Sequence, residues 1–242
     1  KAFEDIVIHP LSWYAERGIT LLAGHTVTGV DRVQRSVTTD QGAVVSYDRL
    51  LLATGSVPFM IPMPGHDHPD VISFRDIADV RRMLEPSATL PRVVVLGGGL
   101  LGLEAANGLV KQGMAVTVVN DAAYLLNRQL DEEASSLLRA ALEAKGIAFK
   151  VAAATSHISH NADTGKLNAL HFKDGSELPC DLLVMAVGVR PNVALARSMG
   201  LQVDKAVLVN DTMQTFDPRV YAVGECVQHR GALFGLVAPL YD

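Results

Sequence analysis

One short stretch, residues 92–104, constrains the fold of this chain more than any other feature. An apolar run of valines and a leucine stops at three consecutive glycines, and Gly102 follows three positions after Gly99. Residues 100–113 then have the apolar spacing of a helix that ends at Gly113. A buried strand that turns on glycines into a helix is typical of phosphate-binding turns. The stretch therefore predicts a site for the pyrophosphate group of a dinucleotide.

Each glycine of this turn has its own expected role. Gly97 permits the tight turn, Gly99 lets the backbone approach a pyrophosphate, and Gly102 lets the helix pack closely on the strand. Such glycine patterns also occur in turns of unrelated α/β proteins, so alone this one is weak evidence. Residues 115–119 supply a second apolar strand directly after the helix. These flanks favour a Rossmann unit, in which the helix N-terminus supplies amide donors to the phosphates.

Composition and charge exclude several classes of function. The chain has 242 residues, 49% of them hydrophobic, and a net charge of -5 without runs of lysine or arginine. Binding of nucleic acid needs clustered positive charge and crossing a membrane needs a longer apolar run, so we expect neither partner. The first residues lack the pattern of a signal peptide, which favours a cytoplasmic location. Cys180 and Cys226 are the only cysteines, and no histidine has metal-ligand spacing, so no metal site is expected in this chain.

A repeat relates residues 42–58 to residues 175–191. Both segments contain a glycine, an aspartate, an apolar strand, a second glycine and a proline at identical offsets. Each copy predicts a turn and a buried strand that ends in a loop of small residues, where the backbone lies close to another group. The Rossmann unit lies between the copies and goes with the second one. The first copy then indicates a second, related dinucleotide-binding domain, which has no glycine fingerprint of its own.

Periodicity and turn residues predict most of the remaining elements. Apolar alternation indicates strands, whereas apolar residues three or four positions apart indicate helices. A linker is expected at residues 86–91, which begin and end with proline. The expected helices are residues 73–84 and 131–145, a hairpin-like stretch leads up to residue 172, and the expected strands are residues 19–22, 27–30, 50–52, 182–187, 207–209 and 220–224.

Four motifs follow one another in a characteristic order, at residues 53–58, 97–104, 188–192 and 215–224. This order resembles the flavoprotein reductases with two dinucleotide-binding domains. The resemblance covers the whole chain and implies an α/β fold of two Rossmann-like domains, with an NAD domain inserted into a truncated FAD domain. It implies a partial FAD-binding domain at residues 1–86, an NAD(P)H-binding domain at residues 87–205 and a return segment of the FAD-binding domain at residues 206–242.

Within that group, residues 127–131 and 224–231 look like the large subunit of NAD(P)H-dependent nitrite reductase. Related flavin domains usually carry Gly-Asp where this chain has Gly224 and Glu225, so the Glu225-Cys226 pair is the sharper family clue. The resemblance implies hydride transfer from NADH to flavin in the electron-entry part of an assimilatory enzyme, without an acid–base catalytic residue. A rubredoxin- or ferredoxin-type NADH reductase is one alternative, and a non-catalytic dinucleotide-binding module is another.

A complete FAD domain would open with its own glycine fingerprint. Gly18, Gly24 and Gly29 do not have that spacing, so the FAD domain is expected to be truncated and to hold FAD weakly in this chain alone. The sirohaem and iron–sulfur groups of a nitrite reductase need cysteine clusters that this sequence lacks. The resemblance therefore implies that those groups belong to a portion of the parent protein outside this chain.

The resemblance also implies which residues contact the cofactors. Glu225 would accept a hydrogen bond from a ribityl hydroxyl of FAD, and the small residues 53–55 would line a passage beside the flavin. Val27 is expected at the adenine and Arg75 at the pyrophosphate, although a buried strand valine and a surface arginine give the same sequence. The full FAD set is Val27, Ala53, Thr54, Gly55, Arg75, Gly224 and Glu225; the NAD(P)H set is Gly97, Gly98, Gly99, Leu100, Leu101, Gly102, Glu104, Asn120, Arg128, Val187 and Gly188.

Nucleotide choice depends on the residue that follows the second strand of the Rossmann unit. An acid there accepts from the ribose 2′-hydroxyl of NAD, whereas a nearby arginine accommodates the 2′-phosphate of NADP. Here the strand ends at Asn120, Asp121 follows, and Arg128 is the cation close in sequence. We therefore expect NADH to be preferred, with NADPH possible. Glu104 is expected near the nicotinamide, although an acid near a helix N-terminus also suits the dipole of any helix.

Overall fold

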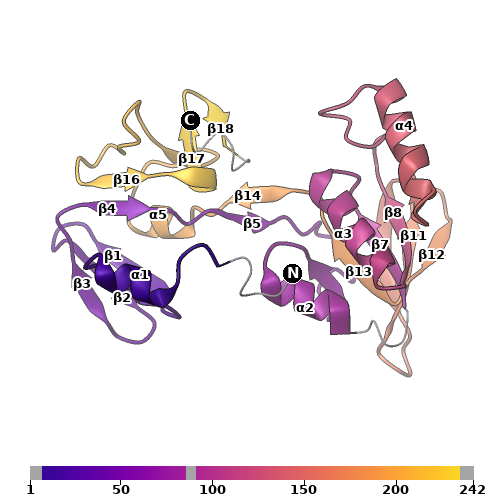
Figure 1. Ribbon diagram of the computed structural model, residues 1–242, viewed down its shortest axis with the longest axis horizontal. Helices are drawn as coiled ribbons and strands as arrows, with labels where there is room; N and C mark the ends of the chain where they lie inside the picture. The colour runs from indigo at the N-terminus through magenta and orange to yellow at the C-terminus, as the bar shows by residue number, and fades with distance from the viewer. Residues whose placement is uncertain (1–6, 86–90, 235–242) are drawn as a thin grey trace. The chain divides into compact units, whose positions relative to one another are not determined.

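The computed structural model describes residues 7–85 and 91–234 and divides into two compact units (Figure 1). The first unit consists of Lys1–Gly55 and Pro191–Asp242, and the second unit is Ser56–Arg190. The first unit is thus interrupted in sequence by the second. Both contain α-helices and β-strands, and the second is built on a parallel sheet, which makes the chain an α/β protein.

The bounds of these units differ from the expected ones, which fall after residues 86 and 205. β6 (Val71–Ser73) pairs in parallel with β13 (Leu182–Met185) and so belongs to the sheet of the second unit. Within α5 (Ala194–Ser198), Ala196 is buried in the core of the first unit. Strand pairing and packing, rather than turn composition, thus decide to which unit a segment belongs. Residues 86–90 of the expected linker lie outside the described residues.

A five-stranded parallel sheet forms the core of the second unit, in the order β6-β13-β7-β8-β9. Alternate residues of its central strand, β7 (Arg92–Leu96), pack into two different hydrophobic clusters, because successive side chains of a strand point to opposite faces of the sheet. Val95 packs in one cluster with Leu103 of α3, and Val94 packs in another with Leu170. Burial on both faces explains the continuous apolar run of the sequence. The further elements are α2 (Ile77–Leu84), β7 (Arg92–Leu96), α3 (Leu100–Lys111), β8 (Ala115–Val119), α4 (Glu132–Glu143) and β9 (Ala148–Lys150).

An antiparallel sheet of three strands packs on the second of these clusters. Its first two strands are the expected hairpin, which the structure confirms, and Ile158 and Leu170 contribute to the cluster. Two short strands that follow the second glycines of the sequence repeat, Gly55 and Gly188, pair with each other. The strands are β10 (Thr155–His160), β11 (Leu167–Phe172) and β12 (Glu177–Pro179), and the pair is β5 (Ser56–Pro58) with β14 (Val189–Pro191).

The first unit combines two three-stranded sheets with a parallel strand pair. β4 (Leu50–Leu52) pairs in parallel with β16 (Val220–Ala222), so strands from the two ends of the chain lie side by side in the first unit. Leu52, Val220 and Ala222 are buried in its core. The other elements are α1 (Leu11–Glu16), β1 (Val27–Asp31), β2 (Ser36–Thr39), β3 (Val44–Ser46), β15 (Val207–Leu208), the 3-10 turn η3 (Gly224–Cys226), β17 (Val227–His229) and β18 (Ala232–Leu233).

Most expected elements are confirmed, with shifted ends. α4 begins where Asp131 accepts a hydrogen bond from the Ala134 amide, and Gly146 follows its end with a φ of +91°. The helix expected from residue 73 begins at Ile77 instead, because Asp76 is its N-cap and residues 71–73 form β6.

The strand expected at residues 19–22 is wrong. These residues are irregular and lie between Gly18 and Gly24, which both have positive φ values that bend the chain. No strand of the described residues pairs with them, which leaves their apolar side chains partly exposed. Separately, no helix within residues 7–85 and 91–234 is long and apolar enough to cross a membrane.

Candidate functional site

The glycine turn between β7 and α3 is shaped by close backbone contacts. Gly97 has a φ of +122°, and its amide donates to the carbonyl oxygen of Val119 at 2.8 Å. A β-carbon on Gly97 would overlap the carbonyl group of Ala186, and a β-carbon on Gly102 would overlap the carbonyl oxygen of Gly97. Backbone atoms that cannot move aside therefore account for glycine at both positions.

Gly99 provides the open space that a phosphate needs. It is the N-cap residue of α3, and a β-carbon built on it would meet no atom within 4 Å. The first amides of a helix have no partner within it, and the first turn of α3 carries no acidic residue. These features fit a pyrophosphate group. Glu104 is exposed and stands one position beyond that first turn.

Asn120 lies at the end of β8, and its side chain is turned into the protein. Its residue exposure is 8%. The Oδ1 atom accepts a hydrogen bond from the Gly98 amide at 3.1 Å, and the Nδ2 group donates to the carbonyl oxygens of Ala122 and Tyr124 at 3.2 and 3.0 Å. These three bonds engage both ends of the side-chain amide. The structure thus assigns Asn120 a different environment from the ribose contact expected of it.

The other expected nucleotide contacts lie at the same edge of the parallel sheet or in the turns beside it. Val187 follows β13 and packs against the hydrophobic cluster that contains Val94 and Leu170. Gly188 has a φ of +113°, and a β-carbon on it would meet nothing within 4 Å. Leu100 and Leu101 begin α3 with exposed side chains, and Arg128 is exposed in the turn before α4.

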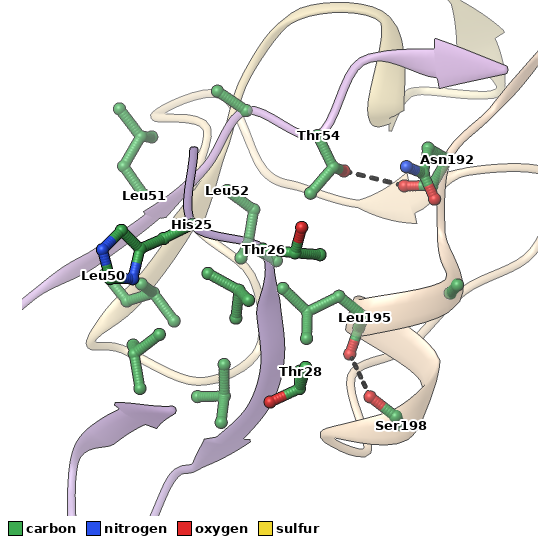
Figure 2. Close-up of a pocket in the computed structure, with 15 residues that line it drawn as sticks. His25, Thr26, Thr28, Leu50, Leu51, Leu52, Thr54, Asn192, Leu195 and Ser198 are labelled. Atoms are coloured by element: carbon green, nitrogen blue, oxygen red, sulfur yellow. Dashed lines mark hydrogen bonds between the residues drawn. The ribbon is translucent and has the colours of Figure 1, made fainter. Parts of the chain in front are cut away.

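A cavity of about 690 Å³ lies in the first unit and is lined mainly by apolar and hydroxyl side chains (Figure 2). Three residues expected to contact FAD, namely Val27, Ala53 and Thr54, line it. Its wall includes the strand residues Leu50, Leu51 and Leu52. An apolar cavity of this size with a few polar groups is suited to a nucleotide base and sugar, so the residues present fit the adenosine part of FAD.

Sequence reasoning missed much of this cavity. The Thr54 hydroxyl donates to the backbone carbonyl oxygen of Asn192 (Figure 2), and the two oxygens lie 2.7 Å apart. The backbone amide of Asn192 donates to the carbonyl oxygen of Gly55 at 2.9 Å. Asn192 directly follows the second copy of the sequence repeat, which could have singled it out. His25 also lines the cavity and interacts with Thr39 at 3.1 Å, but no motif includes it. The other missed lining residues include Thr26, Leu195 and Ser198.

The remaining FAD-set residues lie outside this cavity. Gly224 has a φ of +79° and begins η3, in which Glu225 is half-buried. Gly55 has a φ of +62° at the end of the first unit's opening segment. Arg75 belongs to the second unit, where its amide donates to the Asp79 carboxylate at 2.8 Å.

Two buried cysteines and one aspartate held by a histidine and an arginine are further reactive or charged groups among the described residues. Both thiols are free and buried, and burial raises the pKa of Cys180 to about 12, which makes its thiolate scarce. Asp211 accepts hydrogen bonds from His229 at 2.7 Å and from Arg230 at 2.6 Å. Both bonds lower the pKa of Asp211, and the bond from His229 has the larger effect. No group of three or more histidine, cysteine, aspartate or glutamate side chains within the described part of the chain could hold a metal ion.

Comparison with known proteins agrees with two dinucleotide sites. Residues 5–235 match the model of the family described as pyridine nucleotide-disulphide oxidoreductase. Over its whole length the chain is 45% identical to the assimilatory nitrate reductase electron transfer subunit of Bacillus subtilis, of which the match covers 31%. Over 99% of its length the chain is also 46% identical to the nitrite reductase [NAD(P)H] of that organism, of which the match covers 29%. Among solved structures, the ferredoxin reductase of the CYP199A2 system from Rhodopseudomonas palustris has a TM-score of 0.88 at 28% identity, over 96% of this chain and 58% of that one.

Proposed function

Because the chain belongs to the pyridine nucleotide-disulphide oxidoreductase family, we propose that it transfers electrons from NADH to FAD as the electron-entry part of an assimilatory nitrite reductase. Members of this family bind FAD and NAD(P)H and are flavoprotein oxidoreductases. The observation that carries the proposal is the presence of a glycine turn in the second unit and an apolar cavity in the first. The reaction requires one site for each dinucleotide, and each unit supplies features of one.

In this proposal the second unit is the NAD(P)H domain, inserted into an FAD domain formed by the first unit. When bound, the two cofactors supply the hydride chemistry, and the protein binds and orients them. Gly99 and the first amides of α3 hold the pyrophosphate of NADH. Val27 and Ala53 hold the adenosine part of FAD in the cavity, and Glu225 accepts a hydrogen bond from a ribityl hydroxyl. NADH is the preferred nucleotide.

The role in nitrite reduction is supported by the names of the relatives with the highest identities given above. The chain spans roughly a quarter to a third of those nitrite and nitrate reductase relatives. We propose that a sirohaem and iron–sulfur portion of the parent protein takes the electrons onward and that the protein works in the cytoplasm, without a nucleic-acid or membrane partner. A second candidate is reduction of a rubredoxin or ferredoxin, because putidaredoxin reductase of Pseudomonas putida is 33% identical over 96% of this chain.

Anaerobic spectroscopy of the full-length parent protein tests the proposal. Addition of NADH is expected to bleach the flavin absorbance, and addition of nitrite is expected to restore it. Restoration by oxidised rubredoxin or ferredoxin, with no response to nitrite, would favour the second candidate. A protein whose absorbance NADH leaves unchanged would be a non-catalytic dinucleotide-binding module, and the proposal would be wrong.

A further inference from the structure

Asn120 occupies the place where the nucleotide-selecting residue is expected, yet its polar atoms are all used inside the protein. Its Oδ1 atom takes the amide hydrogen of Gly98, and its Nδ2 group donates to the carbonyl oxygens of Ala122 and Tyr124. A carboxamide has one acceptor oxygen and one two-donor nitrogen. This arrangement therefore uses both hydrogens of the amide and leaves only the second lone pair of the Oδ1 atom, on a residue that is buried at 8% exposure.

The loop that begins with Asn120, directly after β8, contacts Gly98 through hydrogen bonds and through buried side chains. The Leu126 amide donates to the carbonyl oxygen of Gly98 at 3.0 Å, so both polar groups of the Gly98 backbone are bonded to the loop after β8. A β-carbon on Gly98 would lie 2.9 Å from Asn120 Cγ and 2.9 Å from Leu125 Cδ2, and Leu125 is fully buried. The second glycine of the turn is thus a glycine because this loop packs on it.

We propose that Asn120 is a positioning residue: it fixes the glycine turn to the loop after β8 and so keeps the space at Gly99 open for the pyrophosphate, without contacting the ribose. This inference rests on the proposed NAD(P)H site. Asp121 then meets the ribose end of the nucleotide, because it is exposed and follows Asn120 directly. A carboxylate at that position accepts from a 2′-hydroxyl and repels a 2′-phosphate.

Asn120→Asp tests the assignment because the variant keeps the acceptor and the shape but loses both donors at neutral pH. Its carboxylate would face the carbonyl oxygens of Ala122 and Tyr124, so affinity for NAD⁺ is expected to fall about tenfold or more. Lowering the pH toward the range where carboxyl groups protonate restores one donor, and affinity should recover relative to the wild type. The ratio of NAD⁺ to NADP⁺ affinity should stay unchanged, measured by calorimetric titration of the oxidised protein.

Direct contact with the ribose predicts the opposite result. The added carboxylate would then accept from the 2′-hydroxyl, so NAD⁺ would bind more tightly and NADP⁺ more weakly, and the positioning role would be overturned. Asp121→Asn is the matched control, since it removes a charge from the same loop without touching the hydrogen bonds of Asn120. It is expected to increase NADP⁺ affinity relative to NAD⁺, the change of ratio that Asn120→Asp should not produce.

Hydrogen exchange separates this inference from the proposed function. In the wild type without nucleotide, the amide of Gly98 should exchange more slowly than that of Gly99, and Asn120→Ala should remove the difference. Equal exchange of the two amides in the wild type would overturn the inference, whether or not the variants fold. Failure of the wild type to bind NAD⁺ would overturn the proposed function, and with it the role assigned to Asn120 in nucleotide binding.

Discussion

The carbonyl oxygen of Gly97 lies so close to the α-carbon of Gly102 that no β-carbon fits between them. This contact joins the end of β7 to the first turn of α3, and it brings the helix N-terminus up to the carboxyl edge of the parallel sheet. A strand and a helix packed at this distance leave the open space at Gly99 directly before the helix. The packing and the candidate ligand site are therefore consequences of one arrangement.

Replacing Gly102 by alanine is expected to destabilise the protein and to weaken nucleotide binding. The added methyl must displace the Gly97 carbonyl, and overpacking of this kind costs roughly 1–3 kcal/mol. Gly108→Ala is the matched control in the same helix, because a β-carbon there meets no atom within 4 Å. That change should stabilise the protein by up to about 1 kcal/mol through helix propensity. Urea unfolding of both variants checks this, and equal effects would show that the close contact is unimportant.

Replacing Gly99 by valine should separate binding from folding. The side chain meets no protein atom near its β-carbon, so the expected loss of stability is limited to about 1 kcal/mol for a poor helix N-cap. It would, however, occupy the space assigned to the pyrophosphate, and NAD⁺ affinity should fall by at least about tenfold. Calorimetric titration and thermal unfolding measure the two effects. Unchanged NAD⁺ affinity in a folded variant would place the nucleotide elsewhere.

Elements of the second unit whose ends are set by residues adjacent in sequence could be predicted from the sequence. α4 is an example, because its N-cap Asp131 and the positive-φ Gly146 lie next to the helix that they delimit. The irregular segment at residues 19–22 could not be predicted in this way. Its apolar residues match a strand locally, but a strand also needs a pairing partner, and pattern alone does not reveal that none is provided among the described residues.

The environment of Asn120 could not be predicted for a related reason. Its position at the end of the second strand was identified correctly, and the position suggested contact with a ligand. The hydrogen bond to the Gly98 amide spans 22 positions of sequence, and only the folded turn brings the two groups together. In the first unit, Thr54 and Asn192 are even farther apart in sequence and form one wall of the cavity.

Removing the Thr54 hydroxyl should weaken FAD binding more than it weakens the fold. Thr54→Val loses the 2.7 Å hydrogen bond to the Asn192 carbonyl, which costs about 1 kcal/mol of stability. The wall beside Ala53 loosens as a result, and FAD affinity of the full-length parent should drop several-fold. Thr212→Val is the control, because its hydroxyl bonds Asn210 in the same unit and does not line the cavity. Flavin fluorescence during dialysis measures how much FAD each of the two variants retains. Equal retention would show that Thr54 does not contribute to the FAD site.

The ion pair between Arg92 and Asp181 should make stability depend on acid pH. Arg92 holds the Asp181 carboxylate through two side-chain bonds of 3.0 and 2.7 Å and through its backbone amide, and these bonds lower the pKa of Asp181 below its ordinary value of 3.8. A carboxylate with a lowered pKa in the folded state stabilises the protein above about pH 4, and this contribution is lost as the pH falls through the folded-state pKa.

Asp181→Asn should therefore lower the free energy of unfolding at neutral pH and have a smaller effect in acid. Both side chains are partly exposed, at 54% and 42%, so the expected loss is only about 0.2–1 kcal/mol and should shrink as salt is added. Asp163→Asn, at an exposed acid in the turn after β10, is the control and should leave the acid branch of the profile unchanged. Urea unfolding across the pH range measures the difference between wild type and variant. If that difference stays constant from neutral pH down to about pH 3, Asp181 does not contribute through its charge.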